Sequence, residues 1–188
     1  MMKKPKLTIE LIPKTCWYSN IRTTVSKKDW DIIRHLSYEN ANGKCEICGE
    51  KGKDQGFKHD LECHEIWEFD DQNKVQKLIG LIALCPICHL VKHIGRAKAI
   101  GKAEITHKKL MEVNNWTARK TIKYIEEAFL EYIKRSEFEW SLDLSLLQEN
   151  PYNITINATK KRKFKVKKYK KKRKKPSKSK LFTRKTKK

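Results

Sequence analysis

The chain has 188 residues and a formal net charge of +22 at pH 7, with 44 Lys and Arg against 22 Asp and Glu. Residues 160–188 hold 19 of these cations and no acid, so residues 1–159 carry the other 25 cations and all 22 acids, a net charge of +3. No apolar run reaches the roughly 18 residues that a membrane span needs, which excludes an integral membrane protein. We expect a soluble folded domain followed by a polycationic tail.

Residues 1–25 predict an extended N-terminal arm. They contain basic residues and two prolines, followed by the aromatic pair Trp17 and Tyr18. We expect these two aromatic side chains to pack back on the domain. Stacking on unpaired bases is the alternative role for aromatic residues that stand beside cations.

A helix is predicted to follow the arm. Ser26 is suited to cap its first turn, with Asp29 three residues later. Asn42 and Gly43 end it, because both residue types tolerate the left-handed conformation of a helix C-terminus. Trp30 lies on the apolar face of this helix, and we expect it to pack against the cysteine-rich stretch that comes next.

Four of the six cysteines form two Cys-x-x-Cys pairs, Cys45 with Cys48 and Cys85 with Cys88. Two thiolates at this spacing lie on one tight turn and point at one centre, and two such turns complete a four-sulfur Zn²⁺ site. A disulfide framework is the alternative, but the other two cysteines show no pairing pattern. Thiolates that bind zinc indicate a reducing compartment, either cytosolic or nuclear.

Between the two cysteine pairs, the sequence predicts a β-hairpin. Residues 61–69 alternate between apolar and polar types, and His64 and Glu65 stand in the middle of this strand. Residues 70–73 are turn-forming. Residues 74–84 make the second strand, which becomes nearly continuous in apolar residues before the second cysteine pair.

A helix is predicted from Pro86 to about Ile94, with Gly95 as its C-terminal cap. His89 and His93 are four residues apart on this helix. This spacing puts both imidazoles on one face, where they can bind a second metal ion.

These residues resemble the HNH nuclease family over about residues 26–97. The resemblance lies in the layout C-x-x-C, then His, then L-x-x-L-C-x-x-C-H-x-x-x-H. It implies an α+β fold, a small zinc-stabilised ββα-metal domain of the HNH or treble-clef-like kind, with flanking helices. In that family a strand supplies a metal ligand and a general base as adjacent residues, and the helix supplies further ligands.

Two registers relate this sequence to the family's strand pair. In one, His64 is the general base and Cys63 takes the ligand position. In the other, His64 is the ligand and Glu65 takes the base position. Ile66 matches the apolar residue that follows the family's pair, and this favours the second register. The position of the family's Asn is occupied by Gly80.

The resemblance implies a metal-dependent DNA endonuclease that hydrolyses phosphodiesters and nicks one strand with a single metal ion. His89, His93 and His64 would bind Mg²⁺ or Mn²⁺, with Zn²⁺ or Ni²⁺ as alternatives, and His64 or Glu65 would be the base. The partner would be DNA, or alternatively RNA. We expect a monomer or weak dimer, since cutting both strands would require two protomers or two visits.

Residues 98–150 predict a helical extension that packs on the domain. A short helix covers residues 103–113, and Thr117 caps a longer one that runs to about Arg135. A closing strand or short packed segment follows at residues 140–146. The apolar face of the longer helix consists of Ile122, Ile125, Ala128, Phe129, Tyr132 and Ile133.

Residues 151–188 predict a basic tail that is disordered in isolation, because it has few apolar residues to bury. Such a polycation binds nucleic acid with salt-sensitive and largely sequence-independent affinity. It could also serve as a nuclear-import signal. The candidate nucleic-acid-binding residues are Lys160, Lys161, Arg162, Lys163, Lys170, Lys171, Lys172, Arg173, Lys174 and Lys175.

Two other functions are compatible with the sequence. The first is a non-catalytic, zinc-stabilised DNA- or RNA-binding protein that acts as a subunit of a nucleoprotein assembly. The second is protein interaction through the amphipathic helix at residues 117–135. As an endonuclease we expect a cytoplasmic, nucleoid-associated protein, or a nuclear one in a eukaryote or its virus.

Overall fold

The computed structural model describes residues 5–156. Within this range the fold is α+β, with three β-strands, six α-helices and three short 3₁₀ segments. Residues 157–188 of the predicted tail, including the ten candidate nucleic-acid-binding residues between 160 and 175, lie outside the described residues.

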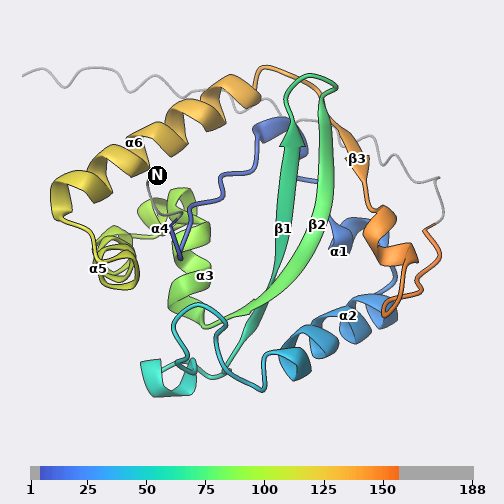
Figure 1. Ribbon diagram of the computed structural model, residues 1–188, viewed down its shortest axis with the longest axis horizontal. Helices are drawn as coiled ribbons and strands as arrows, with labels where there is room; N and C mark the ends of the chain where they lie inside the picture. The colour runs from blue at the N-terminus through green and yellow to red at the C-terminus, as the bar shows by residue number, and fades with distance from the viewer. Residues whose placement is uncertain (1–4, 157–188) are drawn as a thin grey trace, which may run out of the picture. The chain divides into compact units, whose positions relative to one another are not determined.

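A three-stranded sheet forms the centre of the fold (Figure 1). Strand β1 (Glu62–Asp70) pairs antiparallel with β2 (Val75–Leu84), and β3 (Ser141–Asp143) adds to β2 in parallel. In the turn, the Asp70 carboxylate accepts hydrogen bonds from the backbone N–H groups of Gln72 and Asn73, both at 2.9 Å. The predicted hairpin and closing strand are therefore confirmed.

The two faces of the hairpin carry different helices. Neighbouring residues of a strand point to opposite faces, so Glu62 and His64 face α3 (Pro86–Lys92), where Glu62 contacts His89. Glu65 faces the other way, toward α1 (Ile21–Thr24), and α2 (Lys27–Asn40) packs on that side. Figure 1 shows α3 and α2 on opposite sides of the hairpin.

Helix α2 begins and ends as predicted. The Ser26 hydroxyl accepts a hydrogen bond from the Asp29 N–H at 3.1 Å and donates to the Asp29 carboxylate at 2.7 Å. Asn42 and Gly43 have φ values of +50° and +67°, which terminates the helix. The expected contact between Trp30 and the cysteine-rich stretch is wrong, because Trp30 packs in a separate core cluster on the α1 and α2 side of the sheet.

The single helix predicted from Pro86 to Ile94 is wrong. Helix α3 ends at Lys92, His93 leaves helical geometry with φ −100° and ψ +47°, and α4 (Ile94–Ala99) starts at the next residue. Gly95 is therefore inside α4 and is not a cap. A Cβ at this position would lie 3.4 Å from the Leu11 side chain, which places the arm in contact with α4.

Helices α5 (Ala103–Asn114) and α6 (Ala118–Arg135) form the predicted helical extension. Thr117 caps α6 by accepting a hydrogen bond from the Lys120 N–H at 3.3 Å. The predicted apolar face of α6 is only partly correct, because Ile122 and Ile133 are 51% and 57% exposed while Ile125, Ala128 and Phe129 pack on the core. Among residues 5–156, no helix has the length and apolar character to cross a membrane.

Two core clusters divide the interior. One contains residues of the arm, the cysteine-rich stretch, α3 and α5, and α6 packs against it. The other contains Ile21, Ile33, Leu78, Leu147 and Ile154. Residues 151–156, which the sequence analysis assigned to the tail, thus contribute Ile154 to the packed unit.

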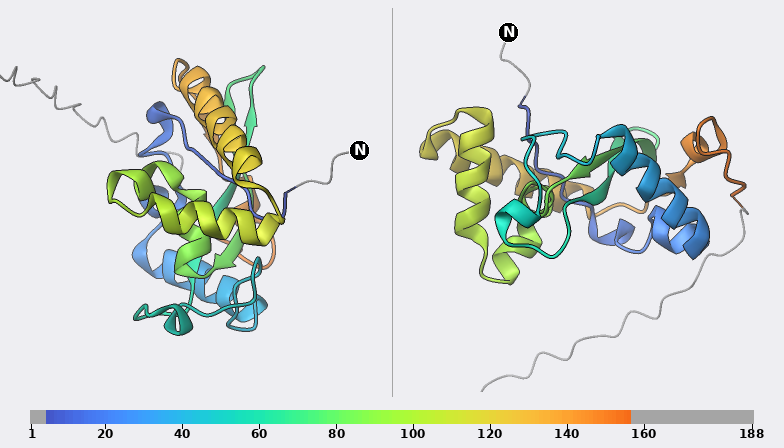
Figure 2. Two further views of the ribbon diagram at one scale, coloured as in Figure 1. Left: turned by 90° about the vertical axis from the view of Figure 1, so that its left-hand side faces the viewer. Right: turned by 90° about the horizontal axis from the view of Figure 1, so that it is seen from below.

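The N-terminal arm passes from one face of the sheet to the other, and Figure 2 shows its course beside the helices. Leu7 and Ile9 are buried on the α3 side, and Ile21 is buried on the α1 side. Trp17 and Tyr18 are 54% and 61% exposed, so the prediction that these two side chains pack back on the domain is wrong. Aliphatic side chains and backbone hydrogen bonds anchor it instead.

Asn114 makes the most direct of these backbone contacts. Its Oδ1 accepts from the Leu7 N–H at 3.0 Å, and its Nδ2 donates to the Leu7 carbonyl at 2.8 Å. We expect Asn114→Ala to destabilise the protein by about 1–3 kcal/mol, because it leaves two partly buried backbone groups without partners.

Chemical denaturation with the Glu112→Ala variant as control checks this prediction. Glu112 is exposed on the same helix and forms only a 4.0 Å ion pair with Lys108, so its loss is expected to change stability by less than about 0.5 kcal/mol. Equal effects of the two substitutions would contradict the prediction.

Candidate metal centres

The four cysteines of the two Cys-x-x-Cys pairs lie together. Their Sγ atoms are all within 4.8 Å of one another, and Cys48 lies 3.6 Å from both Cys85 and Cys88. A tetrahedral zinc ion with Zn–S bonds of about 2.3 Å spaces its sulfurs by about 3.8 Å. The four side chains therefore fit a Zn²⁺ ion, and three of the four are buried.

The charge of this cluster also suits a cation. The thiols of Cys85 and Cys88 donate hydrogen bonds that hold the pKa of Cys45 well below its usual range. Burial and the nearby negative sulfurs raise the pKa of Cys48 to about 12. One thiolate thus opposes ionisation of its neighbours, and a divalent cation is what would let all four ionise together.

Polar side chains contact the cysteine cluster from outside. Gln55 Nε2 donates to Cys85 Sγ at 3.2 Å, and Lys109 Nζ binds both carboxylate oxygens of Glu50 at 2.7 and 2.8 Å. The cysteines outside the cluster differ, since burial raises the pKa of both Cys16 and Cys63 to about 11. They are protonated thiols at neutral pH.

A second cluster consists of His64 on β1, His89 on α3 and His93 at the end of α3. The ring centroids are 5.2 Å apart for His64 and His89, 5.0 Å for His64 and His93, and 4.7 Å for His89 and His93. One nitrogen of each ring lies within 4.8 Å of the others, so the three can hold a metal ion together. The structure thus brings the three predicted histidine ligands to one point.

Two carboxylates bind the outer nitrogens of these rings. Glu10 Oε2 lies 2.8 Å from His64 Nε2, and Glu62 Oε2 contacts His89 Nδ1. These contacts leave Nδ1 of His64 and Nε2 of His89 available to a metal ion. Metal-binding histidines commonly have a carboxylate on the other ring nitrogen, so this arrangement fits a metal site.

Burial keeps two of the imidazoles neutral. It lowers the pKa of His64, opposed by the hydrogen bond to Glu10, and it lowers the pKa of His93 to about 3, helped by the neighbouring imidazoles, which disfavour a further positive charge. A neutral imidazole has the free lone pair that a metal ligand needs.

Glu10 is ionised despite its burial. Burial would raise its pKa, but the hydrogen bond from His64 and the charge of Lys92 hold the pKa at about 2. Lys92 is itself only 4% exposed, and its Nζ contacts Glu10 Oε1 and donates to Thr8 Oγ1 at 2.7 Å.

The sequence analysis missed both carboxylates. Glu10 is 54 residues from His64 in an arm without a recognisable pattern, so no sequence signal pointed to it. Glu62 could have been found, because it is two residues from His64 and therefore lies on the same face of the strand.

Glu65 does not reach the histidine cluster. It points to the opposite face of β1, where its Oε1 accepts a hydrogen bond from the Ile21 N–H at 3.0 Å and burial raises its pKa to about 7. Cys63 is on the same face as Glu65. The placement of Glu65 as a base beside His64 is therefore corrected, because in this chain the Glu65 carboxylate binds the backbone of Ile21 on the face of β1 away from the histidines.

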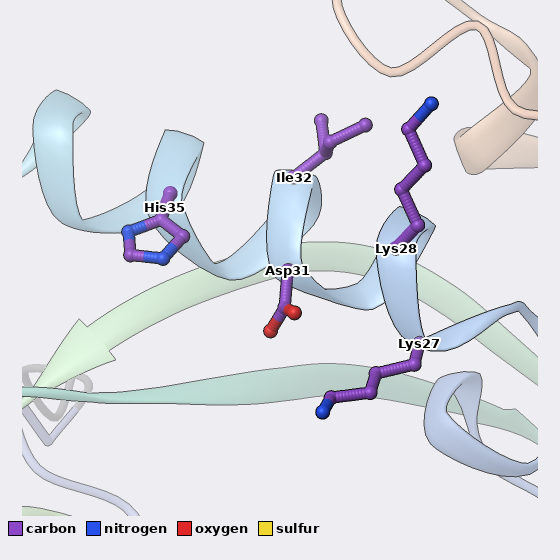
Figure 3. A pocket seen from close by; sticks show the side chains of 5 residues that line it. All are labelled: Lys27, Lys28, Asp31, Ile32 and His35. Carbon is purple, nitrogen blue, oxygen red and sulfur yellow. The ribbon is translucent and has the colours of Figure 1, made fainter.

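A shallow hollow of about 650 Å³ lies on the outer face of α2, away from both clusters. Figure 3 shows the side chains that line it, which project from successive turns of the helix. None of them belongs to a metal centre. The lining residues are Lys27, Lys28, Asp31, Ile32 and His35.

Comparisons of the chain with models of protein families, with curated proteins and with solved structures give no match. The functional argument therefore rests on the geometry of the two clusters.

The cysteine cluster predicts one tightly bound zinc ion that stabilises the fold. We expect Cys88→Ala to abolish binding of this ion and to lower stability by several kcal/mol, because structural zinc contributes about 10–16 kcal/mol in small zinc domains. Elemental analysis and thermal unfolding check both effects. Cys16→Ala is the matched control, since Cys16 is equally buried but outside the cluster, and it should retain the zinc.

The histidine cluster predicts a second metal ion per chain. His93→Ala should lower the metal content after Zn²⁺ loading and desalting from two ions to one, because it removes one of three ligands and leaves the cysteines unchanged. His35→Ala, on the exposed face of α2, should keep both ions. A single ion in the unmodified chain would contradict the second centre.

Proposed function

We propose that this protein is a metal-dependent DNA endonuclease of the HNH type, which hydrolyses one strand at a time. The observation that carries the proposal is the meeting of three imidazoles, one from a hairpin strand and two from the end of α3, the helix that also carries Cys88 of the four-cysteine cluster. A hairpin and the helix that follows it, with ligands from one strand and from the helix, are the elements of the ββα-metal arrangement.

The residues at this site would have different roles. His64, His89 and His93 would hold the divalent cation, with Mg²⁺ or Mn²⁺ as the proposed ions and Zn²⁺ or Ni²⁺ as alternatives suited to imidazole. The cation would bind the scissile phosphate, offset negative charge on the leaving oxygen and make a nearby water more acidic. Glu10 contacts Nε2 of His64 and Glu62 contacts Nδ1 of His89, so neither of these nitrogens would bind the cation.

We assign His64 as a ligand and not as the general base. Its Nε2 contacts Glu10, so only Nδ1 is free. This one nitrogen can bind the metal ion or accept a proton from water, but it cannot do both. The side chain is only 3% exposed, which favours contact with an enclosed ion over proton exchange with bulk water. Metal content distinguishes the two roles. If His64 is a ligand, the His64→Ala variant should lose the second ion; if His64 is the base, the variant should retain it.

The proposed nucleic-acid affinity comes mainly from the C-terminal tail. Residues 1–159 have a net charge of only +3, whereas residues 160–188 carry 19 cations and no acid. Neutralisation of phosphates by these cations releases counterions and gives salt-sensitive binding to DNA or RNA. Association with the cytoplasmic nucleoid, or with the nucleus in a eukaryote or its virus, follows from this proposal.

A non-catalytic nucleic-acid-binding subunit is the second candidate. Two observations favour it: Glu65 lies on the face of β1 away from the histidines, and Gly80 occupies the position of the family's Asn. Under this alternative the two metal centres stabilise the fold and the tail binds the nucleic acid.

Plasmid nicking in Mg²⁺ or Mn²⁺ tests the endonuclease. His89→Ala should lower the nicking rate by more than about 100-fold, since even loss of an outer-shell partner costs about 10–100-fold. Glu65→Gln should keep most of the rate, because Glu65 faces away from the site, whereas loss of a general base costs about 10²–10⁴-fold. DNA binding should be retained in both variants.

His107→Ala is a histidine control on α5, outside the cluster, and should nick at the rate of the unmodified chain. Binding without nicking under any of the four metals would contradict the endonuclease and support the non-catalytic subunit. A large loss of nicking in Glu65→Gln would contradict the assignment of Glu65 to the other face.

A further inference from the structure

We propose that Glu10 is a positioning residue for His64. The N-terminal arm, which carries Glu10, would then contribute to metal binding at the histidine centre. Glu10 would hold the imidazole as the Nε2–H tautomer, which turns the lone pair of Nδ1 toward the cluster. This inference rests on the second metal centre of the proposed function, but it does not depend on cleavage.

The tautomer follows from the chemistry of the contact. An ionised carboxylate can only accept hydrogen bonds, and Glu10 Oε2 lies 2.8 Å from His64 Nε2. The proton must therefore be on Nε2, and a neutral imidazole then has its lone pair on Nδ1. Because His64 is 3% exposed, water does not compete for either nitrogen as it would at the surface.

Lys92 holds Glu10 in place. Its buried ammonium group contacts the second carboxylate oxygen of Glu10, and its backbone carbonyl accepts a hydrogen bond from the Glu10 N–H at 3.0 Å. Lys92 is three residues from His89 and next to His93. The end of α3 and its C-terminal cap thus carry two of the metal ligands and the cation that holds the Glu10 carboxylate.

Contacts on either side of Glu10 hold the arm in this position. The Ile9 N–H donates to the Tyr124 hydroxyl at 3.4 Å, and Thr8 accepts from Lys92. Leu7 is bound through both backbone groups by Asn114. These partners belong to α3, α5 and α6, so the carboxylate reaches His64 only when the arm is docked on all three helices.

Histidine ¹⁵N spectra of the full chain test the tautomer directly. In the chain that holds only the cysteine-bound zinc, His64 should have a protonated Nε2 and an unprotonated Nδ1. Glu10→Ala should abolish this preference. The double variant Glu10→Gln/Lys92→Met should retain it, because the amide oxygen can accept the same hydrogen bond and no unpaired charge remains buried.

Calorimetric titration of Zn²⁺ into the same chain provides the second readout. Glu10→Ala should weaken binding of the second ion by about 10–100-fold, as expected for loss of an outer partner of a ligand, while the cysteine-bound zinc stays. The double variant should lose less affinity than Glu10→Ala. Lys6→Ala is the control on the same arm, because Lys6 is exposed, and it should bind the second ion with nearly the affinity of the unmodified chain.

A protonated Nδ1 of His64 in the unmodified chain would overturn the inference. An unchanged tautomer and an unchanged second-ion affinity in Glu10→Ala would also overturn it. If Glu10→Ala does not fold, the unmodified chain and the double variant decide the question. Failure to nick DNA with the expected tautomer and affinities would overturn the endonuclease alone and leave the role of Glu10 standing.

Discussion

The convergence of the four cysteines is the constraint on which the rest of the structure depends. Cys45 and Cys48 follow α2, whereas Cys85 and Cys88 join the end of β2 to the start of α3. An ion bound by these sulfurs ties the first turn of α3 to a loop that precedes the whole hairpin in the sequence. Because α3 is thereby fixed against the hairpin, the direction of His89 and His93 toward β1 is fixed as well. The histidine cluster is geometrically a consequence of the cysteine cluster.

The alternation of side chains along β1 separates two environments within one strand. Glu62 and His64 face α3 and take part in the network of histidines and carboxylates. Cys63 and Glu65 face α1 and α2, where burial raises the pKa of both side chains. Residues 62–65 therefore alternate between the two faces of the sheet, and the histidine cluster that could hold a metal ion lies on the α3 face.

The buried charges on the α3 side are mutually dependent. Lys92, Glu10 and His64 form a chain of contacts in which each member lies largely out of water. Removing one partner of such a buried pair leaves an uncompensated charge and costs about 3–5 kcal/mol, so the arm, α3 and β1 have to assemble together. The same contacts hold an imidazole in one orientation, and in this way stability and the proposed chemistry depend on the same side chains.

The sequence by itself determined the features that depend on local spacing. These are the two Cys-x-x-Cys pairs, the hairpin between them, the caps of α2 and α6, and the pairing of His89 with His93. Tertiary structure decided the rest: the contact of Glu10 with His64, the break between α3 and α4 at His93, the exposure of Trp17 and Tyr18, and the burial of Ile154. The physical reason is that turns, caps and helical faces are set by residues within a few positions of one another. The partner of a buried charge is instead set by whichever segment the packed helices bring next to it. The spacing of residues in the sequence does not predict which segment that is.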